Sequence, residues 1–218
     1  MFEELLETVK KLAAASQRPP FDPAGFNDPV ATSTKWTPKM DGDANFSTHL
    51  VAVGPERMEF KAPWGTKLFC GTLLFVGLTS MFAIPVALWN HINPLLVLFF
   101  GSFGLTFGAI GAVVYRGAQP IVFDRRIGCF WKGRHDPSKE FDRSNIKSLT
   151  ELSDLHALQL VSHLHRTKSG SHYSYEMNMV FKDGRRQTIV DHRNLEQIRK
   201  DARMLGSFLQ VPLWDAVG

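Results

Sequence analysis

The sequence predicts an α+β membrane protein, in which a two-helix transmembrane hairpin is joined to a cytoplasmic antiparallel β-sheet closed by a C-terminal helix. Three observations lead to this prediction. Two long stretches carry no charged residue, strand-like alternation follows the second of them, and an amphipathic helical pattern comes last. The uncharged stretches determine the class of protein, and the later patterns determine the fold of the domain that follows.

The two uncharged stretches predict a transmembrane hairpin over residues 66–115. Residues 68–89 give 22 positions without a charge and residues 95–115 give 21, and each stretch is long enough to cross a hydrocarbon core of about 30 Å as a helix. The connecting NHINP, residues 90–94, is short and uncharged. Two buried helices of a soluble protein are the alternative, but soluble core helices rarely run this far without a charge.

The flanking charges predict the orientation of this hairpin. The flanking basic residues are Arg57, Lys61 and Lys67 before the first span, and Arg116, Arg125, Arg126, Lys132 and Arg134 after the second. The connection between the spans has no Lys or Arg. Because basic loops stay on the cytoplasmic side, we expect a protein of the cytoplasmic (inner) membrane with both termini in the cytoplasm.

Three segments precede the membrane. Residues 1–14 have the apolar periodicity of a short amphipathic helix, which could dock on this protein, on a partner or on the membrane surface. Residues 15–47 are rich in Pro, Asp, Asn and Ser and predict an irregular segment. Residues 48–62 predict a pre-membrane β-hairpin that turns at Gly54-Pro55 and could add strands to the cytoplasmic sheet.

Residues 116–218 predict the cytoplasmic domain. Strands are expected on both sides of a turn at 125–127, in one or two short runs within 140–152, over 155–167, and on both sides of Asp183-Gly184, a pair that favours a type I′ turn. Asn194 then predicts a helix N-cap with Gln197 as its capping-box partner. An antiparallel sheet closed by one C-terminal amphipathic helix is the layout of a pleckstrin-homology-like (PH-like) half barrel, among other small α+β folds.

A glycine stripe on the second span predicts helix packing. Gly101, Gly104, Gly108 and Gly111 are spaced so that they fall on one side of the helix. Small residues let helix backbones approach closely in lipid. The stripe is expected either to pack on the first span, against Gly71, Gly77 or Ser80, or to contact a second copy of the chain or another membrane protein.

The basic residues after the second span predict a membrane-surface site. Its members are Arg116, Arg125, Arg126, Lys132 and Arg134. Residues 116–218 hold 17 Lys and Arg against 12 Asp and Glu, a balance of +5, and anionic lipid head groups lie close to a tethered basic domain. RNA binding is a second explanation of this charge, but no RNA-binding signature is present, so no nucleic-acid partner is expected.

Candidate catalytic and metal-binding residues give weaker patterns. His163 and His165 share one strand face and form a potential ligand pair, but no family-like third ligand follows, so solvated strand histidines are the preferred interpretation. Asp191 and His192 could exchange protons, but they stand where a strand enters a helix, and polar residues are ordinary there. Because no nucleotide, zinc-protease or serine-hydrolase motif is present, no catalytic, cofactor-binding or metal residue is predicted, no cofactor is expected, and the chain is expected not to be an enzyme.

The arrangement of residues 68–214 resembles the two-span photosystem I assembly factor family. In both, two adjacent spans precede a strand with the pattern F-D-R-x-x-G and a helix that ends F-L-x-V-P. The matching residues are Phe123, Asp124, Arg125, Gly128, Phe208, Leu209, Val211 and Pro212. The chain also looks similar to uncharacterised bacterial two-span inner-membrane proteins. The resemblance implies the architecture and a role in holding or assembling membrane complexes, and it assigns neither a photosynthetic role nor a site residue.

Three functions are therefore open. The first is a non-enzymatic scaffold or assembly factor that holds protein partners at the cytoplasmic membrane. The second is an immunity or modulator protein whose spans block a membrane-acting toxin through the glycine stripe. The third is a sensor of anionic lipids or of another ligand, acting through the basic domain.

Overall fold

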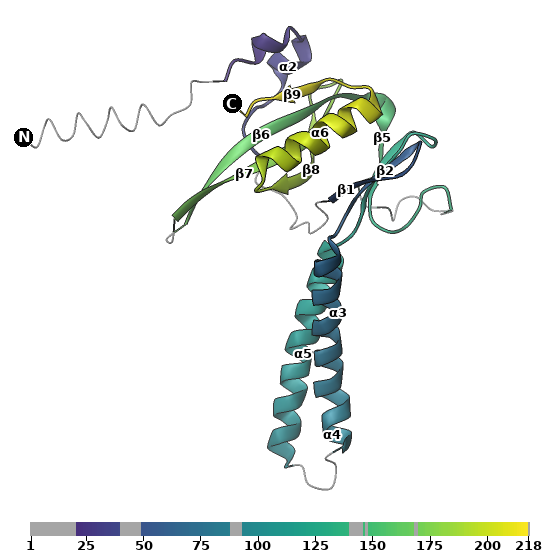
Figure 1. Ribbon diagram of the computed structural model, residues 1–218, viewed down its shortest axis with the longest axis vertical. Helices are drawn as coiled ribbons and strands as arrows, with labels where there is room; N and C mark the ends of the chain where they lie inside the picture. The colour runs from purple at the N-terminus through teal and green to yellow at the C-terminus, as the bar shows by residue number, and fades with distance from the viewer. Residues whose placement is uncertain are drawn as a thin grey trace, which may run out of the picture.

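A computed structural model of the chain shows two β-sheets, a helix packed on them and a long helical hairpin (Figure 1). The structure describes residues 21–39, 49–87, 93–139, 146, 148–167 and 170–217. The predicted helix over residues 1–14 and most of the NHINP connection lie outside the described residues. The prediction of a mixed α+β protein with antiparallel sheets is confirmed.

The first sheet contains five strands in the order β1-β2-β3-β4-β5, all antiparallel. Its strands are β1 (His49–Gly54), β2 (Arg57–Lys61), β3 (Ile121–Asp124), β4 (Cys129–Lys132) and β5 (Thr150–Glu151). The tight connection between β1 and β2 lies at Pro55 and Glu56. Within the predicted strand region 140–152, β5 is the strand that the described residues contain, since residues 140–145 and 147 lie outside them.

The helical hairpin is inserted between two strands that pair with each other. Strand β2 ends at Lys61 and the first helix begins at Trp64, while the last helix ends at Gly117 and β3 begins at Ile121. Strands β2 and β3 then pair along their length, with Phe60 opposite Ile121. The hairpin is therefore connected at both ends to strands of the first sheet, and it projects away from both sheets (Figure 1).

The hairpin helices are long and apolar enough to cross a membrane. They are α3 (Trp64–Leu78), a π-helical turn η2 (Thr79–Ala83), α4 (Ile84–Ala87) and α5 (Pro94–Gly117). The continuous helices Trp64–Ala87 and Pro94–Gly117 have mean hydropathies of 1.9 and 2.0 over their most apolar windows. Pro85 accounts for the π turn, because proline has no backbone N–H and its ring crowds the preceding turn. In response, the backbone N–H of Ile84 donates to Thr79 O, five residues back.

The second sheet contains four strands in the order β8-β7-β6-β9. They are β6 (Leu155–Thr167), β7 (Gly170–Phe181), β8 (Arg186–His192) and the short β9 (Leu213–Asp215), which pairs with β6 in parallel. A short 3-10 turn, η4 (Leu152–Asp154), leads into β6. The sequence predicts a single sheet closed by a helix, whereas the structure divides the strands between two sheets.

The connection from β7 to β8 differs from the predicted type I′ turn. A type I′ turn needs positive φ at both central residues. Gly184 has φ +77, and Asp183 is not among the residues with positive φ. The Asp183 carboxylate instead accepts the backbone N–H of Arg185 at 3.0 Å, an Asx-type contact that stabilises a longer turn.

Helix α6 (Leu195–Leu209) covers the inner face of the second sheet (Figure 1). Its buried apolar residues Ile198, Ala202 and Leu205 join a core that both sheets share. This core includes Phe60, Phe123 and Phe130 of the first sheet and Leu158, Leu160, Met177 and Met179 of the second. A single apolar core therefore joins the two sheets and α6 into one unit.

The helix N-cap is formed at Asn194, but the predicted capping box is not. Asn194 Oδ1 accepts the backbone N–H of Gln197 at 3.1 Å. The Gln197 amide reaches forward to Asp201 at 2.9 Å, and the backbone N–H of Asn194 donates to His192 Nδ1 at 2.9 Å. His192 therefore takes the place of the glutamine, because it already stands beside the cap.

Residues 21–39 fold over the outer face of the second sheet and are called the strap. The strap contains η1 (Pro23–Phe26) and α2 (Pro29–Ser33), capped by Asp22 and Asp28, followed by a run without helix. Helix α2 lies at the end of the domain away from α3 and α5 (Figure 1). This part of the segment predicted as irregular therefore has a defined place in the fold, while residues 15–20 and 40–47 lie outside the described residues.

Candidate functional site

The polar residues of the second sheet gather on its outer face, under the strap. Cross-strand register places Gln159 of β6, Asn178 of β7 and Thr188 of β8 opposite one another, and Glu176 is two residues from Asn178 on the same face. Arg186 follows on β8, opposite Val180. We call Gln159, Glu176, Asn178 and Arg186 the polar face.

Each of three polar-face side chains binds a backbone group of the strap. Gln159 Nε2 donates to Lys35 O at 3.2 Å, and Arg186 donates to Thr37 O at 2.8 Å. The Glu176 carboxylate accepts the backbone N–H of Lys39, at 2.9 Å to Oε2 and 3.2 Å to Oε1. These contacts fall on alternate strap residues, as expected for an extended segment lying on a surface.

Aromatic residues hold the strap beside these hydrogen bonds. The Trp36 ring stacks on Phe26 at 5.5 Å and lies 5.9 Å from the ring of Trp214 in β9. Its indole N–H donates to Ala31 O at 2.9 Å. Ala31 is buried with Ala157, Val180 and Trp214 in a small apolar cluster that is separate from the main core. The strap is thus fixed by one aromatic anchor and by polar contacts to its backbone.

Three of the four polar-face side chains are buried, Arg186 is partly exposed, and hydrogen bonds join the four side chains. Gln159 and Asn178 are 0% exposed and Glu176 is 4% exposed. Asn178 Nδ2 donates to Glu176 Oε1 at 2.7 Å, and Arg186 donates to Gln159 Oε1 at 3.0 Å. Burial lowers the pKa of the Arg186 guanidinium, and the nearby Glu176 carboxylate offsets part of this effect.

One polar atom of this network is unsatisfied. Asn178 Oδ1 is buried and has no hydrogen-bond partner among the described residues. Exchanging the amide oxygen and nitrogen would turn the oxygen toward the Glu176 carboxylate, so the present orientation is the favourable one. Buried polar atoms without partners are costly and uncommon in native proteins. The strap therefore leaves the hydrogen-bonding capacity of the polar face incompletely used.

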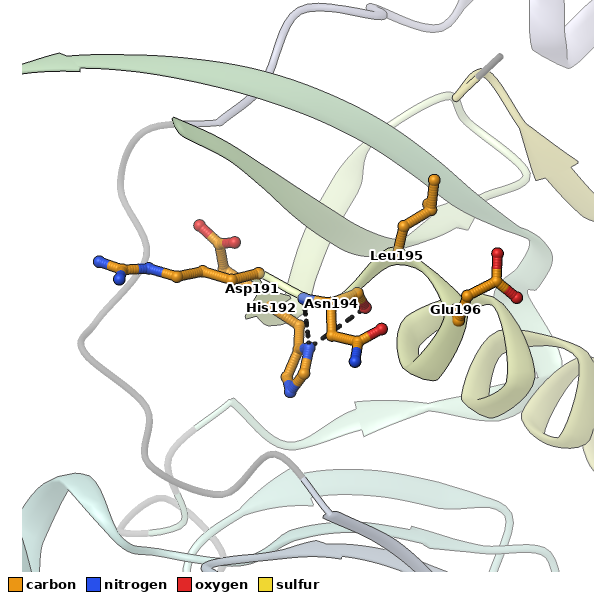
Figure 2. Close-up of a pocket in the computed structure, with 6 residues that line it drawn as sticks. Asp191, His192, Asn194, Leu195 and Glu196 are labelled. Carbon is orange, nitrogen blue, oxygen red and sulfur yellow. Dashed lines mark hydrogen bonds between the residues drawn. The ribbon is translucent and has the colours of Figure 1, made fainter. Parts of the chain in front are cut away.

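An open surface pocket lies beside the polar face, where β8 passes into α6 (Figure 2). It is lined by Asp191, His192, Arg193, Asn194, Leu195 and Glu196. Partial burial raises the pKa of the Asp191 carboxyl, opposed by a hydrogen bond from Ser174. Figure 2 shows that the Asp191 carboxylate and the His192 ring point to opposite sides of the strand. These two side chains are therefore not arranged to share a proton.

The predicted histidine pair lies farther along the same sheet face. The rings of His163 and His165 are 4.4 Å apart, and His172 of β7 stacks on His165 at 5.2 Å. His165 Nε2 is within 2.8 Å of Ser174 Oγ. Among the described residues no group of three potential ligands is arranged to hold a metal ion. The histidines thus form a polar extension of the strand face beyond the strap.

The predicted membrane-surface residues occupy two regions. At the end of α5, the guanidinium of Arg134 lies 4.1 Å from the centre of the Tyr115 ring and donates to Tyr115 O and Ala118 O at 3.4 Å. Arg116 lies in the last turn of α5. At the other end of β3, Arg125 donates to Phe208 O in α6 at 3.1 Å, and Arg126 follows it in the turn.

Lys132 belongs to neither region. Its ammonium donates to Thr188 O at 3.0 Å and so connects the first sheet to β8. The five predicted residues therefore do not form one continuous patch. Whether any of them meets lipid head groups stays a prediction.

The glycine stripe lies partly between the hairpin helices. A Cβ on Gly104 would meet Gly77 O at 2.6 Å, and one on Gly111 would meet the Leu74 side chain at 3.1 Å. A Cβ on Gly77 would reach the backbone of Gly108 at 2.9 Å. In contrast, nothing lies within 4 Å of a Cβ built on Gly101 or Gly108. The middle of the stripe therefore serves close packing on α3, and Gly101 does not.

The polar face itself is absent from the sequence predictions. The alternation of Ser174, Glu176 and Asn178 with larger apolar residues is visible in the sequence, but such polar positions are usually solvated. Its burial depends on a strap more than a hundred residues away. The signal in the sequence is the pair Glu176 and Asn178, an acid and an amide within a strand that is otherwise rich in apolar residues.

Neither a protein-family model nor a curated protein matches this chain. Its function is therefore inferred from the geometry of the polar face, the hairpin and the junction between them.

Proposed function

We propose that this protein is a non-enzymatic scaffold of the cytoplasmic membrane, whose domain holds protein partners in a fixed orientation. In this proposal α3 and α5 cross the bilayer, both termini are cytoplasmic, and the two sheets with α6 form a PH-like domain. The single observation that carries the proposal is the insertion of the helical hairpin between the paired strands β2 and β3.

This insertion supports a fixed geometry because no flexible linker separates the hairpin from the sheet. Two residues, Ala62 and Pro63, connect β2 to α3, and three residues, 118–120, connect α5 to β3. Ala62 is buried, and Gly133 N donates to Pro120 O at 2.9 Å. A flexible tether is enough to keep a sensor or an enzyme at the membrane. Short, packed junctions at both ends of the hairpin also fix the orientation of the domain relative to the hairpin, which a scaffold needs.

The contacts at the end of α5 add to this rigidity. Arg134 binds Tyr115 O and Ala118 O and lies over the Tyr115 ring, so the loop after β4 is attached to the last turn of α5. Arg57 reaches Glu59 at 2.6 Å and Asp136 at 3.5 Å, which fixes the same loop to β2. The hairpin and the first sheet are therefore expected to move as one body.

The large apolar side chains that the hairpin exposes also favour its insertion in a membrane. Phe75, Val86 and Leu95 are each about 70% exposed in the isolated chain, at 71%, 71% and 72%. Large apolar side chains at such exposure would be a severe aggregation hazard in water. In a bilayer the same side chains face lipid.

A linker-insertion experiment tests the scaffold directly. Six-residue Gly-Ser linkers are placed after Pro63 and after Ala118, and the matched control carries one such linker within residues 140–145. Complexes are then purified from native membranes in mild detergent, and partner stoichiometry is measured. We expect the unmodified chain and the control to retain a stoichiometric membrane-protein partner, and the junction variant to lose it while remaining folded in the membrane. Equal retention by the junction variant, or no partner for any chain, would contradict the proposal.

A further inference from the structure

The strap has few buried residues for a segment that covers the polar face of the second sheet. Its buried residues within the described range are Ala31 and Thr34, and its helices have four and five residues. Phe21 is 38% exposed. Segments with few buried apolar contacts open at low free-energy cost, independently of global unfolding. The strap is thus the part of the domain best suited to leave its place.

The chemistry of the polar face supports the same conclusion. A face that stays covered is cheapest to build from apolar side chains, because buried charges and amides lose their hydration. Here the strap lies over a buried carboxylate, two buried amides and a partly exposed guanidinium, and Asn178 Oδ1 gains no partner from it. Such a surface is suited to alternate between water and a polar ligand.

The contacts also show what kind of ligand fits. Two side chains donate to strap carbonyl groups, Gln159 to residue 35 and Arg186 to residue 37. The third, Glu176, accepts the backbone N–H of residue 39. These groups occur in every peptide, so this part of the recognition is independent of sequence. Selectivity comes from the aromatic position between the first two contacts, where the Trp36 ring lies 5.9 Å from the ring of Trp214 in β9.

We propose that the polar face is a docking site for an extended segment of a partner protein carrying an aromatic residue at the position of Trp36, and that the strap occupies this site in cis. The proposal rests on the scaffold function, for which it names a contact surface and a class of partner. Helix α2 of the strap lies at the end of the domain away from the helical hairpin (Figure 1), where a cytoplasmic partner could reach it.

Exchange of the strap by a peptide tests this proposal. A specific protease site is introduced into the full-length protein within residues 41–47, and the protein is cleaved in detergent after purification. A fluorescent peptide with the sequence of residues 21–39 is then added, and its binding is followed by anisotropy. We expect saturable binding with release of the cut strap, and binding weaker by about tenfold or more for the Trp36→Ala peptide.

Protein variants localise the binding to the polar face. Arg186→Ala and Glu176→Ala are each expected to weaken peptide binding about tenfold or more, since each removes a charged partner of the peptide backbone. His163→Ala, on the same sheet face but beyond the strap, is the matched control and is expected to bind as the parent does. Circular dichroism confirms that each variant is folded.

The outcomes separate this proposal from the scaffold itself. If the cleaved, folded protein retains its strap and takes up no peptide at concentrations far above that of the protein, the polar face is not a docking site. Binding that is equal for the parent and Trp36→Ala peptides would also overturn the proposal. Either result leaves the linker-insertion experiment unaffected, because that experiment measures orientation and not strap exchange.

Discussion

Gly77 and Gly104 face each other across the two apolar helices so closely that neither position has room for a side chain. A Cβ on Gly77 would lie 2.9 Å from Gly104 O, and one on Gly104 would lie 2.6 Å from Gly77 O. The Cβ on Gly104 would also lie 2.9 Å from Met81 N in the π turn. The hairpin is therefore held by backbone contact, the form of helix packing that small residues permit in lipid.

This contact predicts opposite results for two glycines of the same stripe. Gly104→Ala forces the helices apart, and we expect it to lower the free energy of unfolding in detergent by about 1–3 kcal/mol. Gly101→Ala meets nothing within 4 Å and gains helix propensity, so its stability should be unchanged or higher by up to about 1 kcal/mol. Equal destabilisation by both changes would show that the stripe packs elsewhere.

The buried carboxylate of the polar face predicts a graded response to substitution. Glu176→Ala removes the acceptor of the Lys39 N–H and the shorter of the two contacts of Asn178 Nδ2, which keeps only Gln159 Oε1 at 3.4 Å, at a cost of about 1–3 kcal/mol. Glu176→Gln keeps one oxygen acceptor and should cost less. Hydrogen exchange at the Lys39 amide reports the change locally, and it should accelerate most in the alanine variant. An unchanged exchange rate in both variants would contradict the contact.

Asp201 predicts a pH dependence of stability. Burial raises the pKa of its carboxyl above the ordinary value of 3.8, and the hydrogen bond from Gln197 opposes that shift. The folded protein therefore holds the proton more tightly than the unfolded chain, and the resulting stability is lost as the pH rises from about 4 through the folded pKa. Asp201→Asn does not titrate, so its stability relative to the parent should increase over this range in pH-dependent urea unfolding.

Asp183 provides a control of opposite sign. Its side-chain hydrogen bond with Arg185 lowers the pKa of its carboxyl, so its contribution to stability is lost as the pH falls. Asp183→Asn should therefore lose stability relative to the parent at neutral pH and approach it in acid. The same slope for both variants would mean that neither carboxyl governs the pH dependence.

The proposed topology predicts a pattern of thiol labelling in intact cells. The native Cys70 and Cys129 are both buried, so the parent should react poorly with a membrane-impermeant maleimide. Asn90→Cys, in the connection between the spans, should react from outside, whereas Lys182→Cys, an exposed site in the turn after β7, should react only after the membrane is permeabilised. Labelling of Lys182→Cys in intact cells would invert the orientation.

The sequence predicts the parts of this fold that depend on local pattern. The absence of charge predicts two long apolar helices, and the alternation around Met177 and Met179 predicts a strand whose apolar side faces the core. Asn194 predicts a helix start because its side chain accepts an N–H three residues away. In each case the deciding interactions lie within a few residues or repeat at a fixed period.

The sequence does not predict features that depend on distant partners. The strap has no periodicity, and its position depends on contacts such as that of Lys39 with Glu176, which are 137 residues apart. The predicted capping box does not form because the backbone N–H of Asn194 donates to His192 Nδ1 and not to Gln197. The hydrogen bond from Lys132 Nζ to Thr188 O likewise joins residues 56 positions apart, and no local pattern encodes it.

The position of the hairpin between β2 and β3 also has a consequence for how the protein is made. A chain synthesised from its N-terminus completes β2 before the apolar helices and β3 only after them, so Arg57 must wait for its strand partner Asp124. If the hairpin enters the bilayer as proposed, the first sheet closes only when both spans have been inserted and β3 has returned to the side of β2. Correct insertion would then be a checkpoint for folding of the domain, and a chain that failed to insert would lack its core.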